Sequence, residues 1–170
     1  RTDLELLLEI GIPAIKVGSD DLTNIPLIRS YAEEQLPLIL SSGMSDLAEI
    51  YSSINVAGGF DGHPVALLLC TSQYPTPPTE VNLAKISTLK AALPGITIGF
   101  SDHTKGSLAS SLAVVLGSTI IEKHFTLDHD LPGPDHWFSE DPIGLKEWVD
   151  SIRIAHTMKG SSVVRPTQIE

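Results

Sequence analysis

The chain has 170 residues, of which 42% are hydrophobic and 19% charged, a composition typical of a folded globular protein. Its net charge of −10 argues against nucleic acid or an acidic membrane as a partner, and no apolar run reaches the roughly 18 residues that cross a bilayer. The single cysteine, Cys70, excludes an internal disulfide, so we expect a reducing compartment such as the cytoplasm.

Strands and helices are predicted to alternate along the whole chain, with a long loop at 125–141. Apolar runs predict strands at 14–18, 38–40, 65–70, 97–100 and 119–123. Helical periodicity predicts helices at 2–10, 25–35, 45–56 (with Ser45 as its N-cap), 80–92, 107–116 and 142–159. This alternation predicts a parallel α/β sheet covered by helices, either open or closed into a barrel. The chain begins at Arg1 with a helix already under way, so we expect it to be a fragment.

Two histidines, His103 and His124, each end an apolar run, and one helix is predicted between the runs. The strands of such a unit lie parallel and about 4.8 Å apart, which brings both histidines to one edge of the sheet. Alternation along each strand places Ser101 beside His103, and Glu122 beside His124. Two imidazoles with few carboxylates leave coordination positions open, which suits a divalent Lewis acid such as Mn²⁺, Co²⁺ or Zn²⁺. The alternative is that each histidine is satisfied within the core or a loop.

Polar residues follow the other strands as well, at the edge where α/β barrels place their active sites. Lys16 is the expected anchor for a carboxylate or phosphate, because a lysine within an apolar run is rarely buried without a partner. The alternative is that its ammonium group reaches solvent. Hydroxyl donors for the same anion are expected from Ser19, Ser41, Ser72 and Ser101. Small polar residues also begin loops and cap helices, which is the alternative for each serine.

Six motifs in order together resemble the sialic acid synthase family. They are Lys16-Val-Gly-Ser19, Leu40-Ser-Ser-Gly-Met44, Cys70-Thr-Ser-Gln-Tyr-Pro75, Gly99-Phe-Ser-Asp-His-Thr104, Glu122-Lys-His-Phe-Thr-Leu-Asp128 and Gly133-Pro-Asp-His136. Each motif is weak alone, but the ordered set is specific. The resemblance implies a (β/α)8 TIM barrel of which this chain supplies strands four to eight. Residues 1–160 are then the C-terminal part of the catalytic domain, and 161–170 a linker toward an absent antifreeze-like domain.

The resemblance also implies a metal-dependent condensation of phosphoenolpyruvate with an N-acylated amino sugar of the N-acetylmannosamine type. The products are a nine-carbon sialic acid and phosphate, released with C–O cleavage. The family assigns the metal to His103 and His124, with Mn²⁺ expected first and Co²⁺ or Mg²⁺ as alternatives. Phosphoenolpyruvate-contacting positions match Lys16, Ser19, Ser41, Ser72 and Ser101. Positions near the sugar and metal match Tyr74, Glu122 and Asp135. Catalytic roles are expected for Lys16, Asp21 and Glu122.

The chain departs from the family at two of these positions. Asp21 stands where many members carry a longer glutamate at a proposed proton-handling position, and Ser72 where some carry asparagine. The resemblance implies a homodimer for the full-length protein, in which the partner's antifreeze-like domain closes the sugar site, so the 170 residues alone are expected to be inactive or barely active. The alternatives are condensation with a phosphorylated sugar, and a truncated barrel without catalysis.

Overall fold

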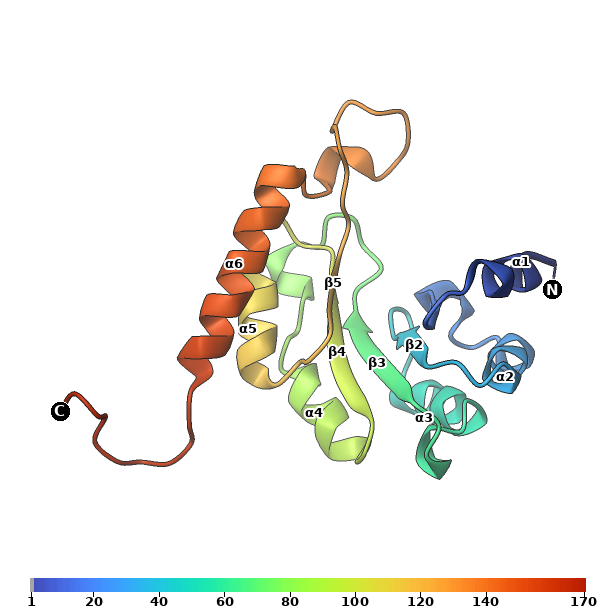
Figure 1. Cartoon of the computed structure of the whole chain (residues 1–170), viewed down its shortest axis with the longest axis horizontal. Helices are drawn as coiled ribbons and strands as arrows, with labels where there is room; N and C mark the ends of the chain where they lie inside the picture. Colours follow the sequence, from blue (N-terminus) through green and yellow to red (C-terminus); the bar gives the residue numbers. More distant parts are fainter. Residues whose placement is uncertain (1) are drawn as a thin grey trace.

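The structure is a computed structural model that describes residues 2–170, and its core is a single parallel sheet (Figure 1). Its strands, in the spatial order β1-β2-β3-β4-β5, are Ile15–Val17 (β1), Leu38–Ser41 (β2), Val65–Cys70 (β3), Thr97–Asp102 (β4) and Ile121–Lys123 (β5). The α-helices are Thr2–Ile10 (α1), Ile25–Glu33 (α2), Leu47–Val56 (α3), Lys85–Ala92 (α4), Leu108–Leu116 (α5) and Pro142–Lys159 (α6). A helix follows every strand, so the predicted α/β alternation is confirmed.

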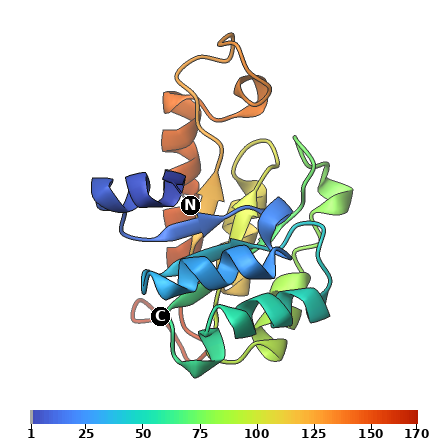
Figure 2. The ribbon, with the colours of Figure 1, turned by 90° about the vertical axis from the view of Figure 1, so that its right-hand side faces the viewer.

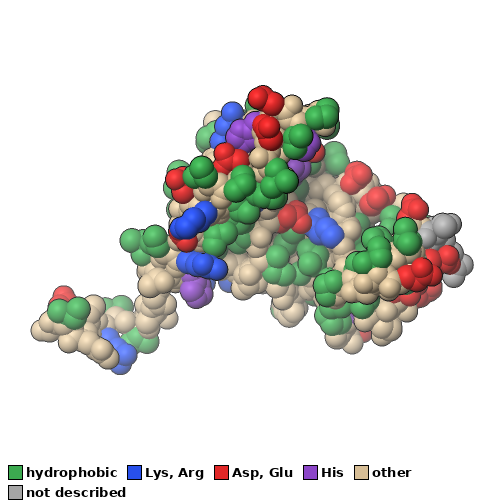
Figure 3. All heavy atoms as spheres, turned by 45° about the horizontal axis from the view of Figure 1, so that its top comes forward, with side chains coloured by type: hydrophobic (Ala, Val, Ile, Leu, Met, Phe, Trp, Pro, Cys, Tyr) green, Lys and Arg blue, Asp and Glu red, His purple; other side chains and the backbone are tan. Residues whose placement is uncertain are grey.

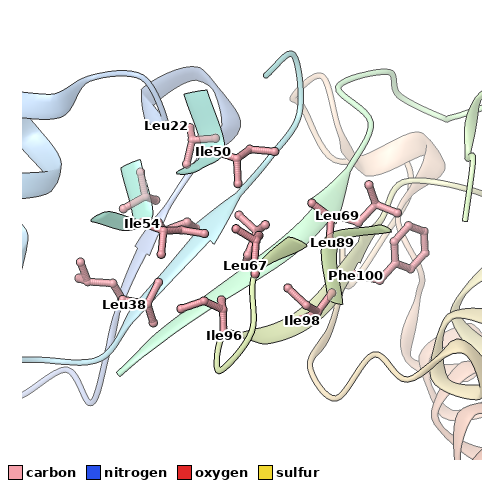
Figure 4. Close-up of a cluster of buried hydrophobic side chains, with 14 of the residues drawn as sticks. Leu22, Leu38, Ile50, Ile54, Leu67, Leu69, Leu89, Ile96, Ile98 and Phe100 are labelled. Carbon is pink, nitrogen blue, oxygen red and sulfur yellow. The ribbon is translucent and has the colours of Figure 1, made fainter. Parts of the chain in front are cut away.

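The main hydrophobic core lies between the sheet and the helices. Every second side chain along β2, β3 and β4 points toward the helices, because side chains alternate across a strand (Figure 4). Leu38, Leu67 and Ile98 are examples, and Ile54 of α3 and Leu89 of α4 complete the cluster. Full burial of each such side chain stabilises the fold by about 1.5–3 kcal/mol. The polar side chains near the carboxyl ends of the strands, such as Ser41 and Ser101, lie on the opposite face.

The sheet is curled, as the partial barrel predicts. In a flat sheet of five strands, β1 and β5 would lie about 19 Å apart, since neighbours are spaced by about 4.8 Å. Yet Lys16 of β1 and Glu122 of β5 lie with Nζ and Oε2 only 3.6 Å apart. The strands twist relative to one another along the sheet, which brings its two edges closer together. In Figure 2, β1 runs across the view, whereas β5 runs nearly vertically. The side chains that face away from the helices therefore converge on the concave side.

Two helices, α3 and α4, start at least two residues later than predicted, and α2 ends at Glu33, two residues before its predicted end. Ser45 is not the N-cap of α3. Asp46 is, and it forms a capping box in which its side chain accepts from the Glu49 amide and the Glu49 side chain from the Asp46 amide, each at 2.9 Å. Helix α4 begins at Lys85 rather than at residue 80, because Asn82 adopts a left-handed backbone with φ of 49° that interrupts the helix.

The long loop between β5 and α6 contains one short 3-10 helix, His136–Phe138. After α6, residues 160–170 form no helix or strand, and Figure 1 shows them leading away from the sheet. Their predicted linker role stays a prediction. Among the helices described in residues 2–170, none combines the length and the apolar character needed to cross a membrane.

Candidate active site

A hollow of about 370 Å³ opens on the concave side, at the carboxyl ends of the strands. It is lined by Lys16, Gly18, Ser19, Asp20, Ser41, Met44, Cys70, Ser72, Tyr74, Ser101, His103, Glu122 and His124. This set includes nine of the residues predicted for the site. Figure 3, with the carboxyl edge turned forward, shows basic, acidic and histidine side chains close together at this end. A larger hollow of about 620 Å³ shares some of this lining but has no histidine among its described lining residues.

Four polar side chains from four strands form the floor of the hollow. Lys16 Nζ donates to Ser41 Oγ at 2.8 Å, and Ser101 Oγ donates to Glu122 Oε1 at 2.7 Å. The 3.6 Å ion pair between Lys16 and Glu122 links these two hydrogen-bonded pairs. Because both side chains are more than one-third exposed, the pair contributes only about 0–1 kcal/mol to stability. The ammonium group therefore stays accessible to an anionic ligand.

Three residues next to this floor form what we call the serine cradle: Ser19, Gly43 and Ser72. The amide of Gly43 donates to Ser19 Oγ at 3.0 Å. A Cβ at Gly43 would lie 2.3 Å from Ser72 Oγ and 2.6 Å from Ser19 Oγ, so only glycine fits between the two serines. Ser72 Oγ is buried and has no hydrogen-bond partner within residues 2–170. Since an unpaired buried hydroxyl costs about 1–3 kcal/mol, this group is ready to bind a ligand oxygen.

His103 presents an unshared ring nitrogen to the hollow. Its Nδ1 lies 2.8 Å from the carbonyl oxygen of Thr71, which only accepts, so Nδ1 carries the proton. Burial lowers the pKa of His103, more than its hydrogen bond to Thr71 and its acidic neighbours raise it, so the ring is neutral at pH 7 and Nε2 keeps its lone pair. Ser101 lies 3.4 Å from Nε2 but donates its hydroxyl proton to Glu122. A backbone carbonyl that fixes the ring in this way is typical of a metal-binding histidine.

His124 lies beside His103, and we call the two residues the histidine pair. Their ring centres are 5.1 Å apart. The pKa of His124 is lowered by burial first and by the neighbouring His103 second. Tyr74 packs against both rings, at 4.3 Å from His103 and 5.5 Å from His124. Burial raises the pKa of Tyr74, and nearby acidic groups raise it further, so its hydroxyl stays protonated as a hydrogen-bond donor.

The donor set of the histidine pair suits a divalent metal ion, because imidazole nitrogens are common ligands of such ions. In residues 2–170, no group of three or more His, Cys, Asp or Glu side chains is arranged to hold a metal. The protein would thus supply two nitrogens and leave the other positions to water or substrate. The identity of the metal stays a prediction.

Two predicted residues lie outside the lining of the hollow. Asp21 belongs to a 3-10 turn, Ser19–Asp21, and its Oδ1 accepts a long hydrogen bond of 3.4 Å from Asn24. Its neighbour Asp20 lines the hollow instead. Sequence reasoning missed Asp20, because the 3-10 turn breaks the alternation that orders side chains along a strand. Asp135 lies near the pair, with Oδ2 at 3.9 Å from His124 Nδ1, too far for a hydrogen bond.

Comparison with known proteins identifies the family to which this chain belongs. A model of the NeuB family matches residues 1–164. The chain is 41% identical to the N,N'-diacetyllegionaminic acid synthase of Legionella pneumophila, covering 98% of this chain and 48% of that protein. It is 38% identical to the N-acetylneuraminate-9-phosphate synthase of Drosophila melanogaster, covering 97% of this chain and 44% of that protein.

A solved structure agrees with this relationship. The N-acetylneuraminic acid synthetase of Leptospira borgpetersenii, crystallised with citrate, superposes with a TM-score of 0.91 at 35% identity. The match covers 99% of this chain and 58% of that one. The chain therefore spans about half the length of the curated relatives named above. By sequence and by structure, the chain belongs to the NeuB family.

Proposed function

We propose that this chain is the C-terminal half of a barrel that condenses phosphoenolpyruvate with an N-acylated amino sugar to give a nine-carbon sialic acid and phosphate. One observation carries the proposal. A lysine ammonium, a buried hydroxyl that has no partner within residues 2–170, and an unshared imidazole nitrogen line the same hollow of about 370 Å³. These are the groups needed to bind an anion and a metal side by side. The named relatives, which are synthases of legionaminic acid and N-acetylneuraminate 9-phosphate, support the same chemistry.

Phosphoenolpyruvate brings a carboxylate and a phosphate, and the site offers two matching sets of groups. The Lys16 ammonium binds one anionic group, together with the hydroxyl of Ser41 that it contacts at 2.8 Å. The serine cradle binds the other, with the free hydroxyl of Ser72 as donor. Carbon 3 of the bound phosphoenolpyruvate then attacks the open-chain sugar aldehyde, water adds to carbon 2, and phosphate leaves with C–O cleavage.

The other residues of the hollow act on the sugar. The histidine pair would hold the metal ion, which would supply Lewis acidity for the sugar aldehyde. Glu122 lies within reach of this region and would act as a proton acceptor, because Oε1 accepts from Ser101 at 2.7 Å and Oε2 lies 3.6 Å from the Lys16 ammonium, contacts that a carboxylate makes. Tyr74 and Asp135 are placed next to His124, where they hydrogen-bond sugar hydroxyls.

A free sugar fits the charges of the site better than a phosphorylated one. Lys16 is the one lysine or arginine among the described residues that line the hollow, and Glu122 already faces it. Asp20 in the lining and Asp135 nearby add negative charge. A sugar phosphate would need further cations. Turnover of the phosphorylated sugar alone would favour the other branch of the family, represented by the 9-phosphate synthase.

We further propose that catalysis needs more strands than these five, since the sheet is an open half of a barrel. The 170 residues alone are expected to bind ligands without turnover. The homodimer, the cytoplasmic location and the choice of Mn²⁺ over Co²⁺ or Mg²⁺ stay predictions.

Mn²⁺ binding by the 170-residue chain tests the proposal. Free Mn²⁺ is measured by electron paramagnetic resonance during titration, with and without phosphoenolpyruvate. We expect saturable binding that phosphoenolpyruvate alters and that His103→Ala and His124→Ala each abolish. His156→Ala, at an exposed position of α6, is the matched control and should bind as the unsubstituted chain does. A folded chain without Mn²⁺ binding, or unchanged binding in both variants, would contradict the proposed site.

A further inference from the structure

A buried cluster of charges lies on the far side of the sheet from the histidine pair. The Lys123 side chain is 3% exposed and that of Asp102 is 0% exposed, with Nζ and Oδ2 3.4 Å apart. Lys123 Nζ also donates to the carbonyl oxygens of Thr104 and Gly106, the latter at 3.2 Å, and lies 3.7 Å from Glu140 Oε1. One ammonium group thus joins the end of β4, the turn after it and the segment before α6.

Hydrogen bonds anchor this cluster to the helices behind it. Asp102 Oδ1 accepts from the amide and the hydroxyl of Thr104, each at 2.8 Å. Asp102 Oδ2 accepts from Ser110 Oγ of α5 at 2.5 Å, and Ser110 Oγ accepts from Trp148 Nε1 of α6 at 3.0 Å. Both oxygens of the buried carboxylate are therefore occupied, and the cluster is a fixed support rather than a ligand site.

The cluster sits one residue before each member of the histidine pair. Asp102 and Lys123 are the last register partners of the β4–β5 ladder, and His103 and His124 follow them directly. Because successive side chains alternate, the cluster faces the helices while the pair faces the hollow. The amide of Glu140 also donates to the carbonyl oxygen of His124 at 3.0 Å, which ties the second histidine to the same cluster.

We infer that Lys123 is a positioning residue that sets the spacing of the histidine pair for the metal, an inference that rests on the proposed function. Removing its ammonium would leave the carboxylates of Asp102 and Glu140 without their shared counter-ion at a largely buried place, and would release the carbonyls of the turn that follows His103. Loss of a group that hydrogen-bonds a metal ligand typically lowers metal affinity by about 10–100-fold. Lys123 acts on the histidine pair through the adjoining backbone rather than through the rings, and we expect an effect in the same range.

The test compares Lys123→Met with Lys146→Met in the 170-residue chain. Lys146 forms an exposed ion pair with Asp150 on α6, so its variant controls for the loss of a lysine charge. Mn²⁺ affinity comes from electron paramagnetic resonance, and the visible bands of bound Co²⁺ report ligand geometry. Circular dichroism confirms folding. Glu140→Gln is a milder second variant, because that side chain is 15% exposed.

We expect about 10–100-fold weaker Mn²⁺ binding and altered Co²⁺ bands in Lys123→Met, a smaller effect in Glu140→Gln, and none in Lys146→Met. Loss of stability alone would lower the folded fraction but leave the Co²⁺ bands unchanged. A folded Lys123→Met chain with unchanged affinity and bands overturns the inference. If Lys123→Met does not fold, the same unchanged result in Glu140→Gln overturns it.

Failure of the proposed metal site is distinguishable from failure of this inference. If the unsubstituted chain binds no Mn²⁺, the metal site is refuted. Amide hydrogen exchange of the metal-free chain then tests whether Lys123 holds the turn after His103 in place. Faster exchange across residues 103–106 in the folded variant, with Lys146→Met unchanged, shows that the cluster holds this turn. Unchanged exchange there overturns the inference.

Discussion

Gly43 is the most closely confined position of the proposed anion site, and Gly43→Ala tests the serine cradle. The new Cβ would fall about 1.1 Å inside the ordinary contact distance to Ser72 Oγ and about 0.8 Å inside that to Ser19 Oγ. Both hydroxyls have to rotate away, and the 3.0 Å bond from the Gly43 amide to Ser19 is lost. Overpacking and the lost hydrogen bond together destabilise the fold by about 1–3 kcal/mol, which lowers Tm by roughly 2–12 °C in a chain of this size.

The effect on ligand binding is expected to exceed the effect on folding. A hydrogen bond to a charged group contributes about 1.5–3 kcal/mol, so displacing one cradle hydroxyl weakens phosphoenolpyruvate binding by about tenfold or more. Calorimetric titration with phosphoenolpyruvate and Mn²⁺ measures this. Gly62→Ala is the control, because Gly62 has φ of +97° and a methyl group added there would meet nothing within 4 Å, so this substitution adds backbone strain without a clash. Unchanged affinity and Tm in Gly43→Ala would refute the cradle.

Three further predictions concern stability. Ser110→Ala removes the hydroxyl between a buried carboxylate and a tryptophan, and should lower the free energy of unfolding, measured by urea denaturation, by about 2–4 kcal/mol. Ser118→Ala removes a buried hydroxyl that has no partner in the described part of the chain, and should be neutral or stabilising. By the same measurement, Asp46→Ala should lower the free energy of unfolding by about 1 kcal/mol, and Ser45→Ala should leave it nearly unchanged. Equal losses in the two variants would contradict the capping box. The pKa of both members of the histidine pair is lowered by burial, so the unfolded chain takes up protons first as the pH falls. The stability that the two neutral histidines contribute should therefore be present above about pH 6.5 and decrease below it. Replacing both with glutamine should make the fall in the free energy of unfolding between pH 7.5 and 5.5 smaller.

The strand–helix alternation was predictable because apolar runs and helical periodicity are local signals. The late starts of α3 and α4 have local causes as well. Ser45 and Asp46 are both good caps, and the choice between them depends on the reciprocal contact with Glu49, which composition alone does not reveal. The late start of α4 follows from the left-handed backbone at Asn82, a conformation that the sequence permits but does not require.

The gathering of candidate site residues in one hollow was predictable where strand alternation orders the side chains, as for His103 and Glu122. The supporting cluster was missed because its members, such as Asp102 and Lys123, lie on the other face of the strands from the histidine pair. From the sequence alone, a charged residue at the end of a strand is expected to be exposed in a loop unless its buried partner is known. The register of β4 with β5 pairs these two residues directly, so strand parity with the correct register would have identified them.

The contact between Lys16 and Glu122 has a consequence for the order of folding. It joins the first and the last strand of the sheet, whereas the helices and neighbouring strand pairs rest on contacts much closer in sequence. Loop-closure entropy makes such distant contacts late, since they form only after the segments between them are ordered. The floor of the hollow should thus be the last part of the molecule to assemble. A refolding chain would recover its helical signal before it regains the ability to bind a ligand.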